Sequence, residues 1–134
     1  MMIQFKLLTS KDYSRFYANI SQMNTMVFEE LYYYAYGKNA PYDYYHADYI
    51  VSPKCKYHYE YFRKVKPVAI ELYKAWYSFL VPHLHSDDIV KLKQLGVYIR
   101  DAKDMIELVW YAQLLLKAVL EYKRKQRIVV GERT

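Results

Sequence analysis

Residues that form turns and cross-links are scarce in this chain. Its 134 residues include three glycines, four prolines and one cysteine. A β-sandwich needs many more turn residues than this, so the composition favours helices. Cys55 has no second cysteine to pair with, which excludes an internal disulfide and is compatible with a reducing compartment.

Long apolar runs are also missing. The most apolar stretch, residues 108–120, is interrupted by two polar residues and is shorter than the ~20 residues that a bilayer span needs. The first residues lack the apolar segment and cleavage site of a secretory signal. We therefore predict one helical domain over residues 1–134 without a membrane span, with a lead-in over 1–8 and a flexible tail over 128–134.

Apolar residues recur at helical spacing in the first half of the chain. Residues 13–34 predict one amphipathic helix of about seven turns, which Gly37 ends. The lead-in before it is expected to be a strand or an apolar strap laid on the core, and Thr9 or Ser10 is a candidate N-cap. A second helix is expected to begin at Ser52-Pro53.

The second half of the chain predicts further helices. Pro67 predicts a kink or a break within the second helix, because proline removes a backbone hydrogen bond. Ser86 is a candidate N-cap for a short helix over residues 87–95, which Gly96 ends or bends. The last helix, over 97–126, is apolar on two faces, so we expect it to be central or to present one face to another subunit. The fold class is therefore all-α: an antiparallel, four-helix bundle-like domain with one long Tyr-rich loop.

Tyrosine is the residue in excess, with 18 in the chain. Eleven of them lie within residues 31–62, a stretch that connects the first two predicted helices. Residues 37–52 contain Gly, Asn, Pro and Asp, which interrupt regular structure and predict a long loop. Such a loop is often functional or ordered by a ligand. The alternative is that its tyrosines cap one end of a helical bundle.

Positive charge is concentrated in the later part of the chain. The net charge is +6, but residues 1–53 carry four Lys or Arg against five Asp or Glu, whereas residues 54–134 carry sixteen against nine. This asymmetry is compatible with nucleic acid, an anionic membrane or an acidic protein surface as a partner. It is equally typical of a solvated basic surface with no specific anionic partner.

Catalytic signatures are not recognisable. The glycines are too dispersed for a dinucleotide or phosphate-binding loop, and neither G-x-S-x-G nor H-E-x-x-H occurs. Cys55 lies three residues before His58, a pairing that is usually incidental. The best metal candidates are four residues around one turn, but the aspartates already suit the first turn of a helix. These four are His83, His85, Asp87 and Asp88. We expect no enzyme activity, no catalytic residues, no metal and no cofactor.

Basic and aromatic residues interleave over residues 54–66, and a second basic cluster ends the last helix, where cations also complement the helix dipole. Lys and Arg contact phosphates while tyrosine rings stack on bases. Tyr and Arg are also enriched at protein interfaces, so protein interaction ranks above nucleic-acid binding. The predicted interaction surface consists of Tyr42, Tyr44, Tyr45, Tyr49, Lys56, Tyr59, Arg63, Lys66, Lys123, Arg124, Lys125 and Arg127.

The segments LYYYAYG and YDYYHADY and the closing amphipathic helix give the chain its character. In these features it resembles small helical-bundle proteins of viruses of hyperthermophilic archaea, within the group found in the two-tailed Acidianus virus. One branch of that group is a virion component, and a related branch inhibits the host RNA polymerase. The resemblance implies a non-enzymatic viral protein, located in the virion or the host cytoplasm. It would act as a structural or assembly component or, alternatively, by occluding the DNA-binding channel of RNA polymerase. Its partners would be virion proteins or that polymerase, with self-association and nucleic acid as further alternatives.

Overall fold

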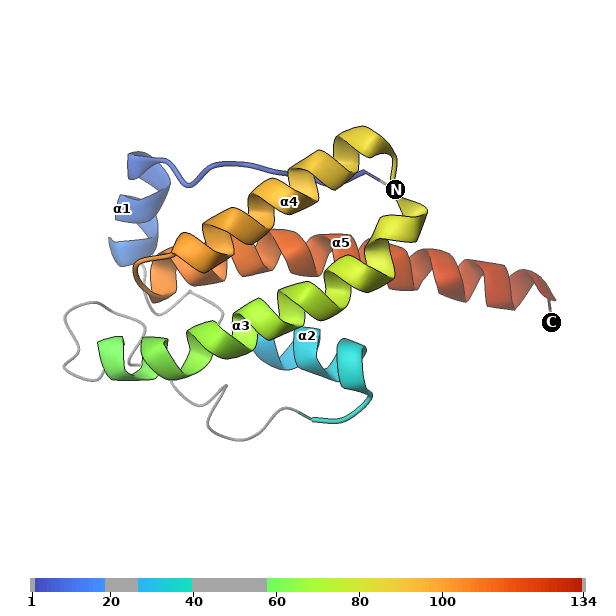
Figure 1. Ribbon diagram of the computed structural model, residues 1–134, viewed down its shortest axis with the longest axis horizontal. Coiled ribbons are helices and arrows are strands. Elements are labelled where there is room, and N and C mark those ends of the chain that lie inside the picture. The colour runs from blue at the N-terminus through green and yellow to red at the C-terminus, as the bar shows by residue number, and fades with distance from the viewer. Residues whose placement is uncertain (1, 19–26, 40–57, 134) are drawn as a thin grey trace.

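The computed structural model describes residues 2–18, 27–39 and 58–133, and these residues are helical apart from an extended segment at residues 2–9 and short connections (Figure 1). The predicted all-α class is confirmed. Five α-helices form within the described residues, so the four-helix arrangement is not confirmed. The elements in order are α1 (Ser10–Ala18), α2 (Val27–Tyr36), α3 (His58–Leu80), the 3₁₀ turn η4 (Val81–His83), α4 (Ser86–Asp101) and α5 (Met105–Arg133).

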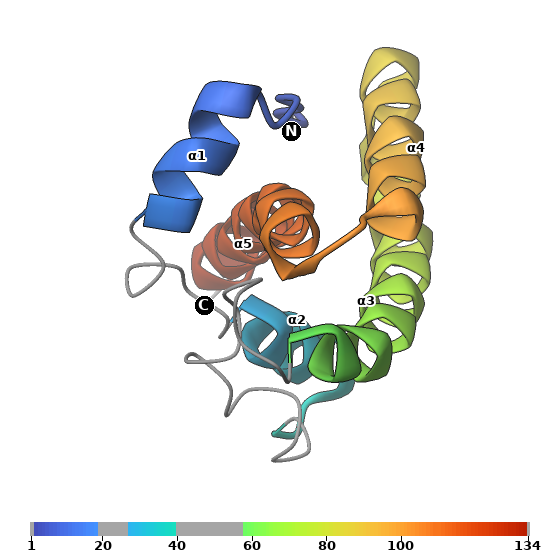
Figure 2. The ribbon, with the colours of Figure 1, turned by 90° about the vertical axis from the view of Figure 1, so that its left-hand side faces the viewer.

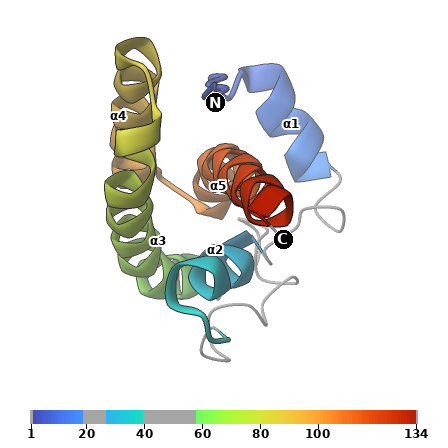
Figure 3. The ribbon, with the colours of Figure 1, turned by 90° about the vertical axis from the view of Figure 1, so that its right-hand side faces the viewer.

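Helix α5 occupies the centre of the molecule, with the other four helices placed around it (Figures 2 and 3). Both of its apolar faces contribute to the core: Ile106 and Val109 on one and Leu115 and Val119 on the other are at most 1% exposed, whereas Leu120, further along the first face, is 40% exposed. This confirms the expectation that a helix apolar on two faces is central. The helix also continues through residues 128–133, where a flexible tail was expected.

Helices α1 and α2 are separate. They point in different directions and lie on different sides of α5 (Figures 1 and 2), so the prediction of one helix through both was wrong. Each has a local stop or start signal. The Thr9 hydroxyl accepts a hydrogen bond from the amide of Asp12 (3.1 Å), as an N-cap does. Gly37, with φ of 70°, follows α2 directly and donates its amide to Tyr33 O (2.7 Å).

A kink or a break was predicted at Pro67, and helix α3 runs unbroken through it, so the break was wrong. The helix curves along its length (Figure 2), and Pro67 is exposed. The core contacts on the other side of the helix explain why it persists: Val65, Ala69 and Leu72 are at most 3% exposed. Burial of a valine or leucine side chain is worth about 1.5–3 kcal/mol, so Val65 and Leu72 together offset the ~3 kcal/mol that an interior proline costs.

The boundary between the last two helices lies later than predicted. Helix α4 continues past Gly96 to Asp101, and α5 begins at Met105. Asp104 starts the new helix: its Oδ1 accepts from the amide of Glu107 (3.0 Å), and Glu107 Oε2 accepts from the amide of Lys103 (2.7 Å). This reciprocal arrangement resembles a capping box. At the start of α4 the N-cap is His85 rather than Ser86, and its side chain makes no capping bond.

Residues 2–9 form an extended strap rather than a strand, and the strap lies across the seam between α4 and α5 (Figure 1). Ile3 is 1% exposed, and its amide donates to Asp88 Oδ1 (3.1 Å) on α4. On α5, the indole of Trp110 donates to Lys6 O (2.8 Å), and the Tyr111 hydroxyl accepts from the amide of Leu8 (3.1 Å). Backbone groups that no strand partner satisfies are thus bonded by side chains.

Candidate interaction groove

Five residues of the predicted interaction surface lie outside the described residues: Tyr42, Tyr44, Tyr45, Tyr49 and Lys56. The remainder fall into two groups, one on the first turns of α3 and one on the last turns of α5. Figure 1 shows these segments at opposite ends of the long axis of the molecule. The structure therefore does not bring the two groups together into one surface.

The α3 group contains Tyr59, Arg63 and Lys66. Tyr59 is 51% exposed and Arg63 is exposed. Lys66 has a structural contact: its Nζ donates to Ala102 O (2.9 Å) at the C-terminus of α4 and lies 5.4 Å from the ring of Phe62. A cation at this position satisfies a terminal carbonyl group and complements the helix dipole. Lys66 is thus already engaged within the molecule.

The α5 group is also partly used within the molecule. Lys123 Nζ lies 5.6 Å from the ring centre of Trp76, and Lys125 pairs with Glu121 (3.5 Å) one turn earlier. Arg124 is exposed, and Arg127 is placed on α5 by its backbone. The contacts of Lys123 and Lys125 are typical of a solvated helix surface.

The four candidate metal ligands do not converge. The ring of His83 packs against Tyr122, with centroids 4.9 Å apart, and Asp88 Oδ1 accepts the amide of Ile3. Within the described ranges no group of three or more His, Cys, Asp or Glu side chains is placed to hold a metal ion. The same ranges contain no helix with the length and hydropathy of a bilayer span.

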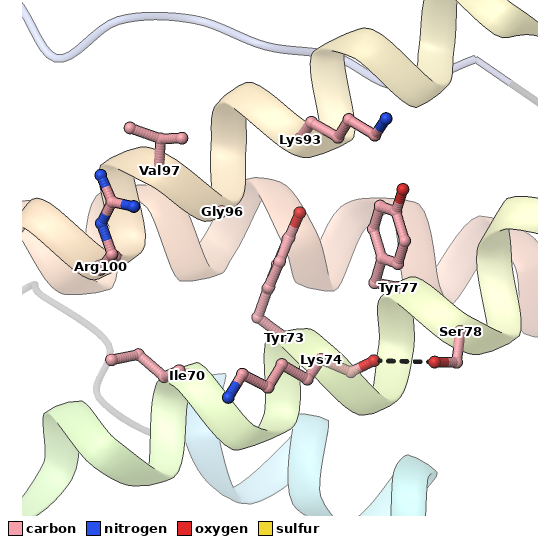
Figure 4. Close-up of a pocket in the computed structure, with 9 residues that line it drawn as sticks. All are labelled: Ile70, Tyr73, Lys74, Tyr77, Ser78, Lys93, Gly96, Val97 and Arg100. Carbon is pink, nitrogen blue, oxygen red and sulfur yellow. Dashed lines mark hydrogen bonds between the residues drawn. The ribbon is translucent and has the colours of Figure 1, made fainter.

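Among the described residues, a groove between α3 and α4 combines an apolar lining with cationic side chains (Figure 4). It encloses about 460 Å³, a size common for binding pockets. None of its lining residues was predicted to belong to an interaction surface, and Gly96 was predicted only to end or bend a helix. The lining residues are Ile70, Tyr73, Lys74, Tyr77 and Ser78 of α3 and Lys93, Gly96, Val97 and Arg100 of α4.

The floor of the groove is made by Tyr73. Its ring reaches from α3 to α4 beside Gly96 (Figure 4), and its hydroxyl donates to Leu92 O (2.7 Å). A Cβ atom at position 96 would overlap the Tyr73 ring, which explains why glycine is found in mid-helix here. Burial raises the pKa of Tyr73 to about 12. Because its hydroxyl is already bonded, Tyr73 presents ring carbon rather than a polar group to the groove.

The rim of the groove carries three cations and no carboxylate. Two of them pair with acids just outside: Lys74 with Glu71 (3.6 Å) and Arg100 with Asp101 (3.0 Å). Arg100 also lowers the pKa of Asp101 through its hydrogen bonds. Lys93 is exposed and has no ion pair among the described residues. The groove is therefore an apolar trough with positive ends.

Other hollows surround the strap and are more polar. One of about 570 Å³ is lined by Met2, His85, Lys91 and Glu121 among others, and one of about 430 Å³ lies between Lys6 and Lys117. Lys91 and Glu121 line the same hollow with opposite charge, so no single charge type dominates it. The smaller hollow also has aromatic residues in its lining, Phe5 and Trp110, and the indole of Trp110 is already bonded to Lys6 O of the strap.

Comparisons of the chain with protein-family models, curated proteins and solved structures found no match. The groove and its surroundings are accordingly the basis of the functional proposal.

Proposed function

We propose that this protein is a non-enzymatic interaction protein that binds another protein through its surface. The observation that carries the proposal is the α3–α4 groove, because its walls are apolar, its floor is aromatic and its ends are cationic. Large aromatic side chains and arginine are the residue types that dominate protein-binding energy. Such a trough suits a docked side chain or helix of a partner.

Exposed aromatic residues elsewhere support the same function. Tyr33 and Tyr36 on α2 are 50% and 48% exposed, and Tyr59 and Phe79 on α3 are 51% and 48% exposed. Tyrosine combines a large apolar area with a hydroxyl that can bond at a wet interface. Tyrosine is also among the residue types that are enriched at protein interfaces.

The resemblance to archaeal viral proteins supports a role for this protein in a virion or in an infected cell. On that basis we assign the protein first as a virion structural or assembly component, acting in the virion or the host cytoplasm. Inhibition of the host RNA polymerase is the second assignment, and the exposed Tyr59 and Arg63 at the start of α3 favour it as a basic and aromatic contact. Direct nucleic-acid binding is the third.

A capture experiment tests the primary proposal. The full-length protein, immobilised and incubated with nuclease-treated extract of infected host cells, is expected to retain a defined polypeptide in stoichiometric amount. Mass spectrometry identifies that polypeptide. Retention of no protein, or loss of all binding after nuclease treatment, would refute a protein-binding function.

Two assays separate the alternatives. A polymerase inhibitor must reduce transcription when added in stoichiometric excess over the host enzyme, and unchanged transcript yield removes that assignment. A nucleic-acid-binding protein must lose affinity steeply as salt rises and must weaken in Arg63→Ala. Arg63 is a cleaner test than Lys66, because Lys66→Ala also removes the hydrogen bond to Ala102.

A further inference from the structure

We infer that the α3–α4 groove binds an acidic amphipathic helix that carries an apolar centre and carboxylates about two turns apart. The inference rests on the proposed protein-binding function and specifies the chemistry of the partner. The spacing and identity of the groove residues determine each part of it.

The positive ends set the spacing of the partner's carboxylates. Lys93 and Arg100 lie seven residues apart on α4, which corresponds to about 10 Å along a helix. They stand at the two ends of the groove in Figure 4. A helix lying along the groove places acidic residues at positions i and i+7 opposite these cations.

The middle of the groove sets the apolar centre. Val97 is 44% exposed, and with Ile70 and the ring of Tyr77 it flanks the floor made by Tyr73. The rings of Tyr73 and Tyr77 are 5.9 Å apart, so they form a continuous aromatic surface. Leucine or an aromatic residue at positions i+3 and i+4 of the partner would bury this surface.

The cations are available to a partner's carboxylates. Lys93 has no ion pair among the described residues, and the side chains of the pairs Lys74–Glu71 and Arg100–Asp101 are each more than half exposed. Exposed pairs of this kind contribute between about 0 and 1 kcal/mol. A carboxylate that arrives with apolar burial can therefore replace Asp101 as the partner of Arg100.

The charge of the groove favours an acidic protein over nucleic acid. Three cations against the two neighbouring carboxylates leave a net charge of +1. Tight binding of a phosphate backbone needs several uncompensated cations, with roughly 6–10 phosphate contacts in strong complexes. The apolar floor and the single unpaired lysine suit a helix with a few carboxylates.

Selection from a random library of displayed peptides, about 14 residues long, tests the inference with the full-length chain. We expect the selected peptides to be acidic, to have an apolar centre and to show the i, i+7 spacing. The best peptide is then synthesised with a fluorescent label, and its affinity is measured by anisotropy. A version with Lys in place of its acidic residues serves as the charge-reversed probe.

Two pairs of variants locate the site. Val97→Glu is expected to weaken the acidic peptide at least about tenfold, because it puts a carboxylate into the apolar centre. Val90→Glu is the matched control: Val90 lies two turns earlier on the same face of α4, is 55% exposed and does not line the groove. Lys93→Glu is expected to weaken the acidic peptide and to bind the charge-reversed probe, whereas Lys11→Glu on α1 should do neither.

Removal of the competing carboxylate gives an effect in the opposite direction. In Asp101→Asn, Arg100 loses its neighbour's carboxylate, so the acidic peptide is expected to bind about two- to fivefold more tightly. Circular dichroism melts of all variants establish that they are folded. An unchanged or weaker affinity in this variant contradicts the role given to Arg100.

Several outcomes overturn the inference. These are selection of basic or uncharged peptides, selection of none, or equal binding by wild type and Val97→Glu. Two further outcomes assign the groove to another occupant: a single-stranded oligonucleotide whose binding Val97→Glu abolishes, or a concentration-dependent dimer in sedimentation that the same variant dissociates. If Val97→Glu still captures the native polypeptide, the protein-binding function stands and this site assignment fails.

Discussion

Helix α4 borders two seams, and the chain covers one of them and leaves the other open. The seam with α5 is covered by the strap, which buries Ile3 and bonds its backbone to Asp88, Trp110 and Tyr111. The seam with α3 has no such cover among the described residues and forms the groove. The covered seam shows what holds an extended segment beside α4: a buried apolar side chain and polar side chains that bond the backbone of the segment.

The covered seam also has cations and aromatic rings, but they already have partners. Lys6 lies 5.6 Å from the ring of Trp110 and 3.7 Å from Asp12, and the ring of Phe5 is 6.3 Å from that of Tyr111. In the groove, Lys93 and Val97 are exposed without equivalent contacts. The strap thus makes within the chain the kinds of contact that a separate partner would make in the groove.

The largest effect is expected from truncating the anchor of the covered seam. Ile3→Ala should reduce the free energy of unfolding by about 2–4 kcal/mol, because it removes a side chain that is 1% exposed. Leu7→Ala, at a strap residue that is 49% exposed, is the control and should change it by less than about 0.5 kcal/mol. Chemical denaturation measures both. Equal effects would mean that the strap is not anchored at Ile3.

The next largest effect is expected at Gly96, where the sign of the stability change depends on whether the Tyr73 ring is present. Gly96→Ala gains about 1 kcal/mol of helix propensity but forces the Tyr73 ring away, which costs about 1–3 kcal/mol plus the bond to Leu92. We expect a net loss of about 1–2 kcal/mol in the wild type. In a Tyr73→Ala background the same change should be stabilising. Destabilisation in both backgrounds would contradict the steric role of Gly96.

A smaller loss of unfolding free energy is expected at alkaline pH. One tyrosine from each seam contributes to it. The pKa of Tyr73 is raised to about 12 and that of Tyr111 is raised, both mainly by burial. The unfolded chain ionises near pH 10, so the stability that these groups contribute is present below pH 10 and is lost as pH rises toward the folded values. For the partly buried Tyr73 the loss should stay below about 2 kcal/mol.

Denaturation curves between pH 9.5 and 11.5 test this expectation. Tyr73→Phe should make the free energy of unfolding fall less steeply over that pH range, since it removes one of the ionising groups. Tyr111→Phe is the matched variant from the covered seam and should have the same effect. If neither variant changes the slope, other groups account for the alkaline loss.

The smallest effect on stability is expected at the rim of the open groove. Lys93→Gln should change the free energy of unfolding by less than about 0.5 kcal/mol, because Lys93 is exposed and unpaired within the described part of the chain. Thermal melts measure the change. A loss above about 1 kcal/mol would show that Lys93 already makes a stabilising contact within the chain.

Local signals in the sequence were enough to predict much of the fold. Thr9 and Gly37 mark helix ends because capping depends on neighbouring residues alone. The two apolar faces of α5 predicted its central position. The restart at Asp104 also has a local signal, an Asp followed three residues later by Glu, but uninterrupted apolar periodicity across it favoured one long helix.

The groove had no such signal. It depends on how closely α3 approaches α4, and that distance is set by the contact of Tyr73 with Gly96, 23 residues apart in the sequence. Gly96 was therefore interpreted as a helix end rather than as a place of close packing. Lys66 is a second example, because its bond to Ala102 depends on the same tertiary arrangement. The predicted tyrosine loop, residues 37–52, lies mostly outside the described residues.

The strap also has a consequence for how the chain folds during synthesis. The amide of Ile3 bonds to a carboxylate 85 residues later, and Leu8 bonds to a side chain 103 residues later. At about 5–20 residues per second, the ribosome needs on the order of ten seconds to make the chain between such partners. Until then Ile3 and Phe5 have no seam to cover, so the strap is expected to dock among the last steps of folding.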